Sequence, residues 1–267
     1  MPYLGSTIVG KFRLTRRRFL AAGAAGSASL LFSGCDRLSS APKFEEFLSS
    51  AEWLTYRAQR LLGGSHALAR EFGQTDISPV FKVNGTVLPN SEEYAALREN
   101  DFADWRLRVA GLVANPLELT LTDLRLLPQR SQITRHDCVE GWSAIGKWQG
   151  VPLAFVLAKA QLLPQARFVV FHCADTLEQT LDGSGQYYES VDLIDAFHPQ
   201  TILVHGLNDA PLSVGHGAPL RLRVERQLGY KQAKYLMRIE ATDRLDDFRR
   251  GKGGFWEDRG YEWYAGI

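Results

Sequence analysis

The sequence predicts one α+β domain behind an N-terminal export signal. Helical stretches with apolar residues on one face alternate along the chain with short apolar or alternating stretches that are typical of strands. No run of Pro, Gly or Ser divides the body of the chain, and no internal repeat is visible. A chain of 267 residues, 45% of them hydrophobic, is long enough to bury a core without disulfides or metals to hold it together.

The expected elements follow from spacing and from helix signals. Apolar residues at i, i+3 and i+4 predict an amphipathic helix from Pro42 to Leu62, whereas residues 77–90 are turn-rich. A short helix is expected from Thr120 to Leu127, and Pro152 opens an apolar helix that runs to Leu163. Strands are expected at 105–110, 132–138, 166–173, 201–207, 220–226 and 234–241.

Residues 1–34 have the pattern of an export signal. They carry five basic residues and no acidic one, and Thr15-Arg-Arg-Arg-Phe-Leu20 resembles the twin-arginine type of signal. The apolar run that follows has 16 residues, against about 20 for a membrane span, although an uncleaved anchor helix is the alternative. The rest of the chain has 26 basic and 30 acidic residues, a balance that predicts no nucleic-acid partner.

Leu31-Phe-Ser-Gly-Cys35 resembles a lipobox, in which Cys35 would be lipidated after cleavage. We therefore expect a periplasmic protein that is tethered to the inner membrane only through its signal or lipid, with soluble release as the alternative. The expected organisation is a signal at 1–34, an N-terminal helical segment at 35–76 and one domain at 77–267.

The stretch Thr134–Ser143 is the first of three groups that could carry chemistry. It gathers four titratable residues at the end of an expected strand, where Gly141 allows a sharp turn; they are His136, Asp137, Cys138 and Glu140. A cysteine after a strand is more often a small core residue, but each polar neighbour would need its own partner if it were buried. A thiolate here would instead suit a soft metal or a nucleophile.

The other two groups lie further along the chain. Glycines on both sides of His216 would let the backbone approach a ligand closely, unless this is only a tight surface loop. Gly229–Lys234 contributes two lysines that, with Arg221, would suit a phosphate. A strand with two lysines is, however, more often a solvent-exposed edge strand. Cys138 and Cys173 could form one disulfide, and no spacing typical of a self-contained zinc site occurs.

In this order along one chain, the three groups resemble the sulfite-oxidase-type molybdopterin-binding superfamily. The most similar branch is that of the periplasmic protein-methionine-sulfoxide reductase catalytic subunits. The resemblance runs from about Phe81 to Glu240 and is strongest at 136–148, 188–200 and 216–234. It implies a mixed α+β fold with a central β-structure and one molybdenum-molybdopterin cofactor per chain.

The resemblance also implies roles for single residues. Cys138 falls in the family pattern Cys-x-Glu-x-Trp and would be the thiolate ligand of molybdenum, with Glu140 as a proton donor or relay. Cys173 stands where the reductase branch has a threonine, and His216 where it has an asparagine. The implied cofactor contacts are Asn84, Cys173, His216, Arg221, Gly229, Tyr230 and Lys231.

The expected function is two-electron, proton-coupled redox chemistry, with oxygen-atom reduction favoured, on an unidentified small substrate or oxidised side chain. Sulfite oxidation is not expected, because the arginine-bearing segment that follows the ligand cysteine in sulfite oxidases is replaced by Val139–Trp142. The chain has no haem motif, so the resemblance implies a separate electron-transfer partner, a membrane haem protein or a cytochrome. Two alternatives stay open: a non-catalytic lipoprotein that keeps the fold, and a hydrolase in which Cys138 acts with His136 or His216.

Overall fold

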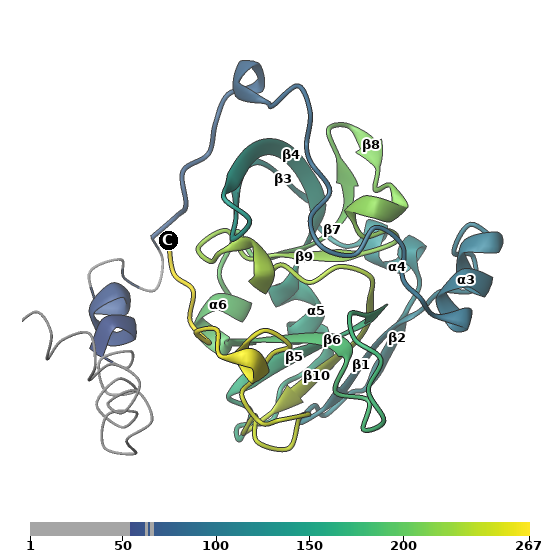
Figure 1. Ribbon diagram of the computed structural model, residues 1–267, viewed down its shortest axis with the longest axis vertical. Helices are drawn as coiled ribbons and strands as arrows, with labels where there is room; N and C mark the ends of the chain where they lie inside the picture. The colour runs from purple at the N-terminus through teal and green to yellow at the C-terminus, as the bar shows by residue number, and fades with distance from the viewer. Residues whose placement is uncertain (1–53, 62–63, 65–66) are drawn as a thin grey trace, which may run out of the picture. The chain divides into compact units, whose positions relative to one another are not determined.

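The computed structural model of the chain describes residues 54–61, 64 and 67–267 (Figure 1). The expected signal at 1–34, Cys35 and most of the helix expected at 42–62 lie outside these residues. Of that helix, residues 54–61 are described and are helical. Within the described residues, no helix has the length and apolar character needed to cross a membrane.

In the unit Tyr56–Ile267, the described strands form two sheets. The first has the order β2-β1-β10-β5-β6, and it is mixed because β1 and β10 are parallel while its other neighbours are antiparallel. Its strands are β1 (Leu107–Gly111), β2 (Leu117–Leu119), β5 (Phe168–Thr176), β6 (Gln186–Asp192) and β10 (Leu236–Thr242). This mixed sheet agrees with the predicted α+β class.

The second sheet is antiparallel, with the order β3-β4-β7-β8 and with β9 paired to β7. Its strands are β3 (Arg130–Cys138), β4 (Trp142–Pro152), β7 (Ile202–Leu207), β8 (Ala210–Pro211) and β9 (Arg221–Arg223). The chain before it also joins β3, since the N–H of Phe72 donates to the carbonyl of Ile133 at 2.9 Å. Residues around 72, expected to belong to the N-terminal segment, thus pack on the domain.

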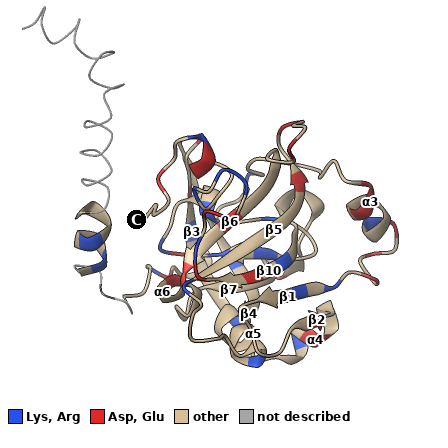
Figure 2. Cartoon of the chain, turned by 90° about the horizontal axis from the view of Figure 1, so that it is seen from below, with Lys and Arg blue, Asp and Glu red and all other residues tan. Residues whose placement is uncertain are grey.

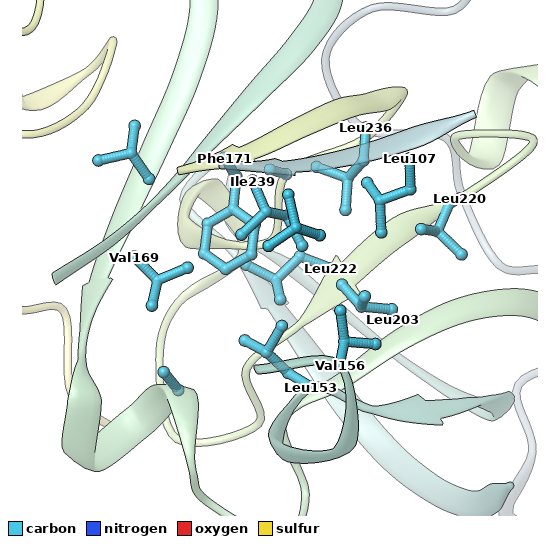
Figure 3. Close-up of a cluster of buried hydrophobic side chains, with 14 of the residues drawn as sticks. Leu107, Leu153, Val156, Val169, Phe171, Leu203, Leu220, Leu222, Leu236 and Ile239 are labelled. Atoms are coloured by element: carbon cyan, nitrogen blue, oxygen red, sulfur yellow. The ribbon is translucent and has the colours of Figure 1, made fainter. Parts of the chain in front are cut away.

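The main core joins the mixed sheet to helix α5 (Leu153–Ala160) and to the inner part of the second sheet (Figure 3). Phe171 and Ile239 come from the mixed sheet, Val156 from α5, and Leu203 and Leu222 from β7 and β9; all five side chains are fully buried. Each such side chain contributes about 1.5–3 kcal/mol through burial. Charged residues of both signs are interspersed over the elements around this core (Figure 2).

Most predicted elements are confirmed, with shifted ends. Helix α4 (Leu121–Leu126) begins at Thr120, whose side chain accepts from the N–H of Asp123, as a helix start requires. Helix α5 ends three residues before the predicted Leu163, because Gln161 adopts a left-handed conformation with φ 57°. The strand expected at 220–226 is shorter, since only Arg221–Arg223 pairs with β7.

Several elements lay outside the prediction. Strand β4 is the longest of these; glycines and polar residues dilute its apolar pattern, but it pairs with β3 and β7 along its length. The others are α3 (Glu92–Glu99), β2, β6, α6 (Leu193–Ala196), β8, and the short 3-10 turns η1 (Gln74–Asp76), η2 (Val214–His216), η3 (Gly229–Lys231) and η4 (Glu257–Arg259).

Candidate active site

A cavity of about 260 Å³ lies beside the turn that joins β3 to β4. Its walls come from residues 84–86, this turn, the end of β5, η3 and the C-terminal part of the chain. Five of the nine predicted site residues line it; they are Asn84, Cys138, Glu140, Gly229 and Tyr230. The fold therefore brings together residues that are up to 146 positions apart in the sequence.

Cys138 is the last residue of β3 and pairs with Trp142 at the start of β4. Gly141 makes the turn between them, with φ 85° and with its N–H donating to the Cys138 carbonyl at 3.1 Å. Burial raises the pKa of the half-buried Cys138 thiol, and the carboxylate of Glu140 adds to this. The chain by itself therefore favours the thiol, and a thiolate at this position needs a nearby cation such as a metal.

Glu140 holds a carboxylate at the cavity two residues beyond the thiol. Its Oε2 accepts a hydrogen bond of 2.9 Å from the indole N–H of Trp142, while the residue as a whole is exposed. A carboxylate fixed in this way and open to solvent can carry a proton between water and the cavity.

Asp175 and Lys234 form a polar part of the wall. The sequence analysis named Lys234 as one of two lysines that would suit a phosphate, but it did not name Asp175. Asp175, at the end of β5, is 4% exposed and its Oδ1 has no hydrogen-bond partner. Burial raises the pKa of Asp175 to about 6. Lys234 donates to the carbonyls of Asn84 (2.6 Å), Thr86 and Gly215 (2.9 Å), and burial followed by the charge of Arg221 lowers its pKa to about 7. The sequence offered one signal for Asp175, which is that it is a polar residue near the end of a largely apolar strand.

Arg221 and His216 lie behind this wall. The Arg221 guanidinium is fully buried, lies 5.0 Å from the ring of Trp148 and donates to the His216 carbonyl at 3.0 Å, while its Nε has no partner. Burial, followed by the charge of Arg223, lowers the pKa of Arg221 to about 9. The His216 ring is 3.0 Å from the Phe81 carbonyl, so its position is set by the chain itself.

Cys173 is buried within β5, opposite Leu236 of β10. Burial, with a smaller effect of Asp175, raises the pKa of the Cys173 thiol well above its usual range. This is the environment of an unreactive core cysteine. Cys138 and Cys173 are both free thiols.

Lys231, predicted to contact the cofactor, is fully buried and is not among the residues that line the cavity. Its ammonium donates to the carboxylates of Glu189 and Glu257, the latter at 2.5 Å. Its charge is therefore already balanced inside the protein. The lysine that lines the cavity is Lys234, three residues later.

His136 lies two residues before Cys138 on β3, and its side chain is buried. Its Nδ1 accepts a hydrogen bond of 2.9 Å from the buried Arg223, and burial, followed by the charge of Arg223, lowers the pKa of His136 well below its usual range. Of the two histidines named for the hydrolase alternative, His216 has both ring nitrogens within hydrogen-bond distance of other groups, Phe81 and Ser213. His136 has its Nδ1 on Arg223, whereas its Nε2 has no hydrogen-bond partner. Because Nδ1 accepts from Arg223, the proton of the neutral His136 ring is on Nε2. In the described residues, neither ring therefore presents an unoccupied basic nitrogen of the kind that a general base for Cys138 needs.

The cavity wall is suited to a large polar ligand. Three lining residues each have a buried polar atom without a partner: Thr86 Oγ1, Asp175 Oδ1 and Gln232 Oε1. Buried polar atoms are almost always paired, so a cluster of unpaired ones marks a place where a ligand completes the hydrogen bonding. With a thiol at one side and cations behind the wall, the residues fit a metal-bearing, phosphorylated cofactor such as molybdenum-molybdopterin.

Comparison with known proteins agrees with this chemistry. The family model described as "Oxidoreductase molybdopterin binding domain" matches residues 94–248, more than half of the chain. The "Putative protein-methionine-sulfoxide reductase subunit YedZ1" of Azospira oryzae is 42% identical over 170 residues, which are 64% of this chain and 59% of that protein. The protein-methionine-sulfoxide reductase catalytic subunit MsrP of Campylobacter jejuni is 32% identical over 148 residues, which are 52% of this chain and 49% of that protein.

Among solved structures, the sulfane dehydrogenase SoxCD of Paracoccus pantotrophus is similar with a TM-score of 0.47 and 24% identity, over 53% of this chain and 39% of that one. The matches to the curated relatives span about half to three fifths of those proteins' lengths. The family match includes Cys138, Glu140, Asp175 and Lys234. On this match, the chain belongs to the oxidoreductase molybdopterin-binding domain family, as its sequence predicted.

Proposed function

We propose that this protein is a molybdenum-molybdopterin oxidoreductase that reduces a sulfoxide, with methionine sulfoxide as the first candidate substrate. The cavity beside Cys138 carries this proposal, because a thiol, a solvent-linked carboxylate and several unpartnered polar atoms meet there. The reductase direction and the substrate are supported by the names of the relatives, which are methionine-sulfoxide reductase subunits.

Cys138 would ligate the molybdenum, and Thr86, Asp175, Gln232 and Lys234 would hold the rest of the cofactor through hydrogen bonds and charge. When bound, one molybdenum-molybdopterin per chain supplies the two-electron redox chemistry. Lys234 is held by three backbone carbonyls, so it would need little reorganisation on binding.

Glu140 would deliver the protons that reduction of a sulfoxide consumes. Its carboxylate lies beside the thiol and is oriented by Trp142, but the residue remains open to solvent, from which it can be reprotonated. Tyr230, Trp256 and Tyr261 line the cavity and would pack against the apolar part of a substrate while excluding water.

We also propose that electrons come from a separate protein, a membrane haem protein or a cytochrome, and that the enzyme works in the periplasm. The twin-arginine pattern and the possible lipidation of Cys35 support this location. A Cys35→Ser variant should move from the membrane to the soluble periplasmic fraction. An unchanged distribution between the two fractions would remove the lipid anchor from the proposal.

The main test is elemental analysis of natively exported protein, combined with turnover of methionine sulfoxide by a reduced dye. We expect about one molybdenum per chain and sulfoxide-dependent dye oxidation. Cys138→Ser should change the spectrum of the metal centre and abolish turnover. Glu140→Gln is the matched variant: it should keep the metal but turn over more slowly, by a factor of about 10²–10⁴.

Absence of molybdenum in protein from a cofactor-competent host would overturn the enzyme proposal. The non-catalytic lipoprotein would then be the better interpretation. Activity that persists without metal and is lost on alkylation of Cys138 would instead favour the hydrolase.

A further inference from the structure

Three buried charged side chains meet outside the cavity. The Lys231 ammonium donates to Glu189 Oε1 and to Glu257 Oε1, and no side chain of the three is more than 1% exposed. The cluster is closed on other sides as well: the N–H of Ser190 donates to Glu189 Oε1 at 2.7 Å, and the Lys231 ammonium lies 5.4 Å from the ring of Trp263. We call Glu189, Lys231 and Glu257 the buried charge cluster.

Each member of the buried charge cluster lies one or two positions after an aromatic residue that lines the cavity. Glu189 follows Tyr187 by two positions on β6, Lys231 directly follows Tyr230 in η3, and Glu257 directly follows Trp256 at the start of η4. We call Tyr187, Tyr230 and Trp256 the aromatic wall. The charges therefore join three chain segments at the points where those segments form the wall.

The aromatic wall has further ties of its own. The Tyr187 hydroxyl donates to the Tyr230 carbonyl, and the Tyr230 hydroxyl donates to the Glu262 carbonyl at 2.6 Å. The backbone at Gly254 also approaches the cluster closely, because a Cβ there would lie 2.0 Å from Glu257 Oε2. A small displacement of any of the three charged groups would thus move the residues beside it.

Stability alone does not account for such a cluster. Taking three charges out of water is costly, and well-packed apolar residues in place of a buried ion pair are often as stable or more stable. Burial, followed by the charge of the Glu257 carboxylate, raises the pKa of Glu189 well above its usual range, so a negative charge on Glu189 is unfavourable at this position. Apolar residues would not supply directional contacts, whereas the two charge-assisted hydrogen bonds of Lys231 fix where the three segments lie relative to one another.

We propose that Lys231 is a positioning residue: through Glu189 and Glu257 it holds the aromatic wall of Tyr187, Tyr230 and Trp256 in place and so sets the affinity of the cavity for the apolar part of its substrate. The identity of that substrate rests on the proposed function. The position of the wall does not.

The test compares the holoenzyme with a Lys231→Met variant, which keeps the length of the side chain but removes its charge. We expect faster amide hydrogen exchange in residues 254–262 and an unchanged rate in α3. For methionine sulfoxide we expect KM to rise about five- to tenfold, as for one lost aromatic contact, with kcat within about twofold. Lys252→Met, at an exposed lysine of the same C-terminal segment, is the control and should change neither quantity.

A second variant keeps the test informative if Lys231→Met does not fold. Lys231→Met combined with Glu257→Gln removes one of the carboxylates that would be left without a partner, so it should fold while its aromatic wall stays loose. Wild-type exchange and wild-type KM in this double variant would overturn the proposal. A fall in kcat with unchanged KM and exchange would also overturn it. If the wild-type enzyme does not reduce methionine sulfoxide, the proposed function fails, and the exchange rates alone decide the role of Lys231.

Discussion

Replacing Asp175 by Asn should stabilise the cofactor-free protein at neutral pH while weakening its hold on the cofactor. Asp175 is 4% exposed, lines the cavity and has an Oδ1 without a partner. Burial is the main cause that raises its pKa from 3.8 to about 6. The ionised carboxylate is therefore destabilising in the folded chain, and an amide of the same shape removes that charge.

The size of the effect follows from the pKa difference between the folded and unfolded states. Below about pH 3 the carboxyl is protonated in both states and contributes no difference. As the pH rises from about 4 to 6, the unfolded state releases its proton first, so the free energy of unfolding falls. A difference of about two pKa units corresponds to about 3 kcal/mol, and the loss is complete above about pH 7.

Urea denaturation at pH 4, 5, 6 and 7.5 measures this directly. The free energy of unfolding of Asp175→Asn should exceed that of the wild type by up to about 3 kcal/mol at pH 7.5 and by only about 0.5 kcal/mol at pH 4. Asp243→Asn, at an exposed carboxylate, is the control and should show no such pH-dependent difference. The reasoning is refuted if the difference for Asp175→Asn is the same at all four pH values.

Two further substitutions test the packing and the buried ion pair that support the site. Gly150→Ala should lower the free energy of unfolding by about 3 kcal/mol or more, because its Cβ would lie 2.1 Å from the Leu203 carbonyl oxygen where β4 meets β7; Gly73→Ala, with its nearest neighbouring atom at 3.4 Å, should cost far less. Arg223→Met should cost about 3–5 kcal/mol in chemical denaturation, because it leaves the buried Glu225 carboxylate without its cation. Adding Glu225→Met should recover most of this loss, and no recovery would contradict the argument.

The part of the site that the sequence predicted best is local. Cys138, Glu140 and Trp142 are close in the chain, and Gly141 between them permits the turn that places thiol and carboxylate at one cavity. Strand β4, which begins at Trp142, was not expected as a strand because its side chains do not alternate cleanly. Its conformation is set by pairing with β3 and β7, which the pattern of one segment cannot reveal.

Asp175 illustrates a second limit. It is the eighth residue of β5, and from its own segment it is simply a polar residue at the end of a buried strand. Its importance comes from its burial in the fold, which leaves one of its oxygens without a partner, and from the charge of Lys234, which lies 59 positions further along the chain. Neither composition nor spacing contains that information.

The two lysines of Gly229–Lys234 show most clearly why contacts between distant segments decide function. By sequence both are cations near a glycine, and the resemblance assigned the first of them, Lys231, to the cofactor. In the fold, Lys231 donates to the carboxylates of Glu189 and Glu257, which lie 42 and 26 positions away in the chain. Lys234 instead donates to three backbone carbonyls. A carboxylate neutralises an ammonium whereas a carbonyl does not, so the positive charge that Lys234 carries when protonated can act on a ligand in the cavity. Burial and Arg221 lower the pKa of Lys234 to about 7, and an anionic ligand would raise it again. Lys231, already paired, can act on the site only by holding the segments that surround it.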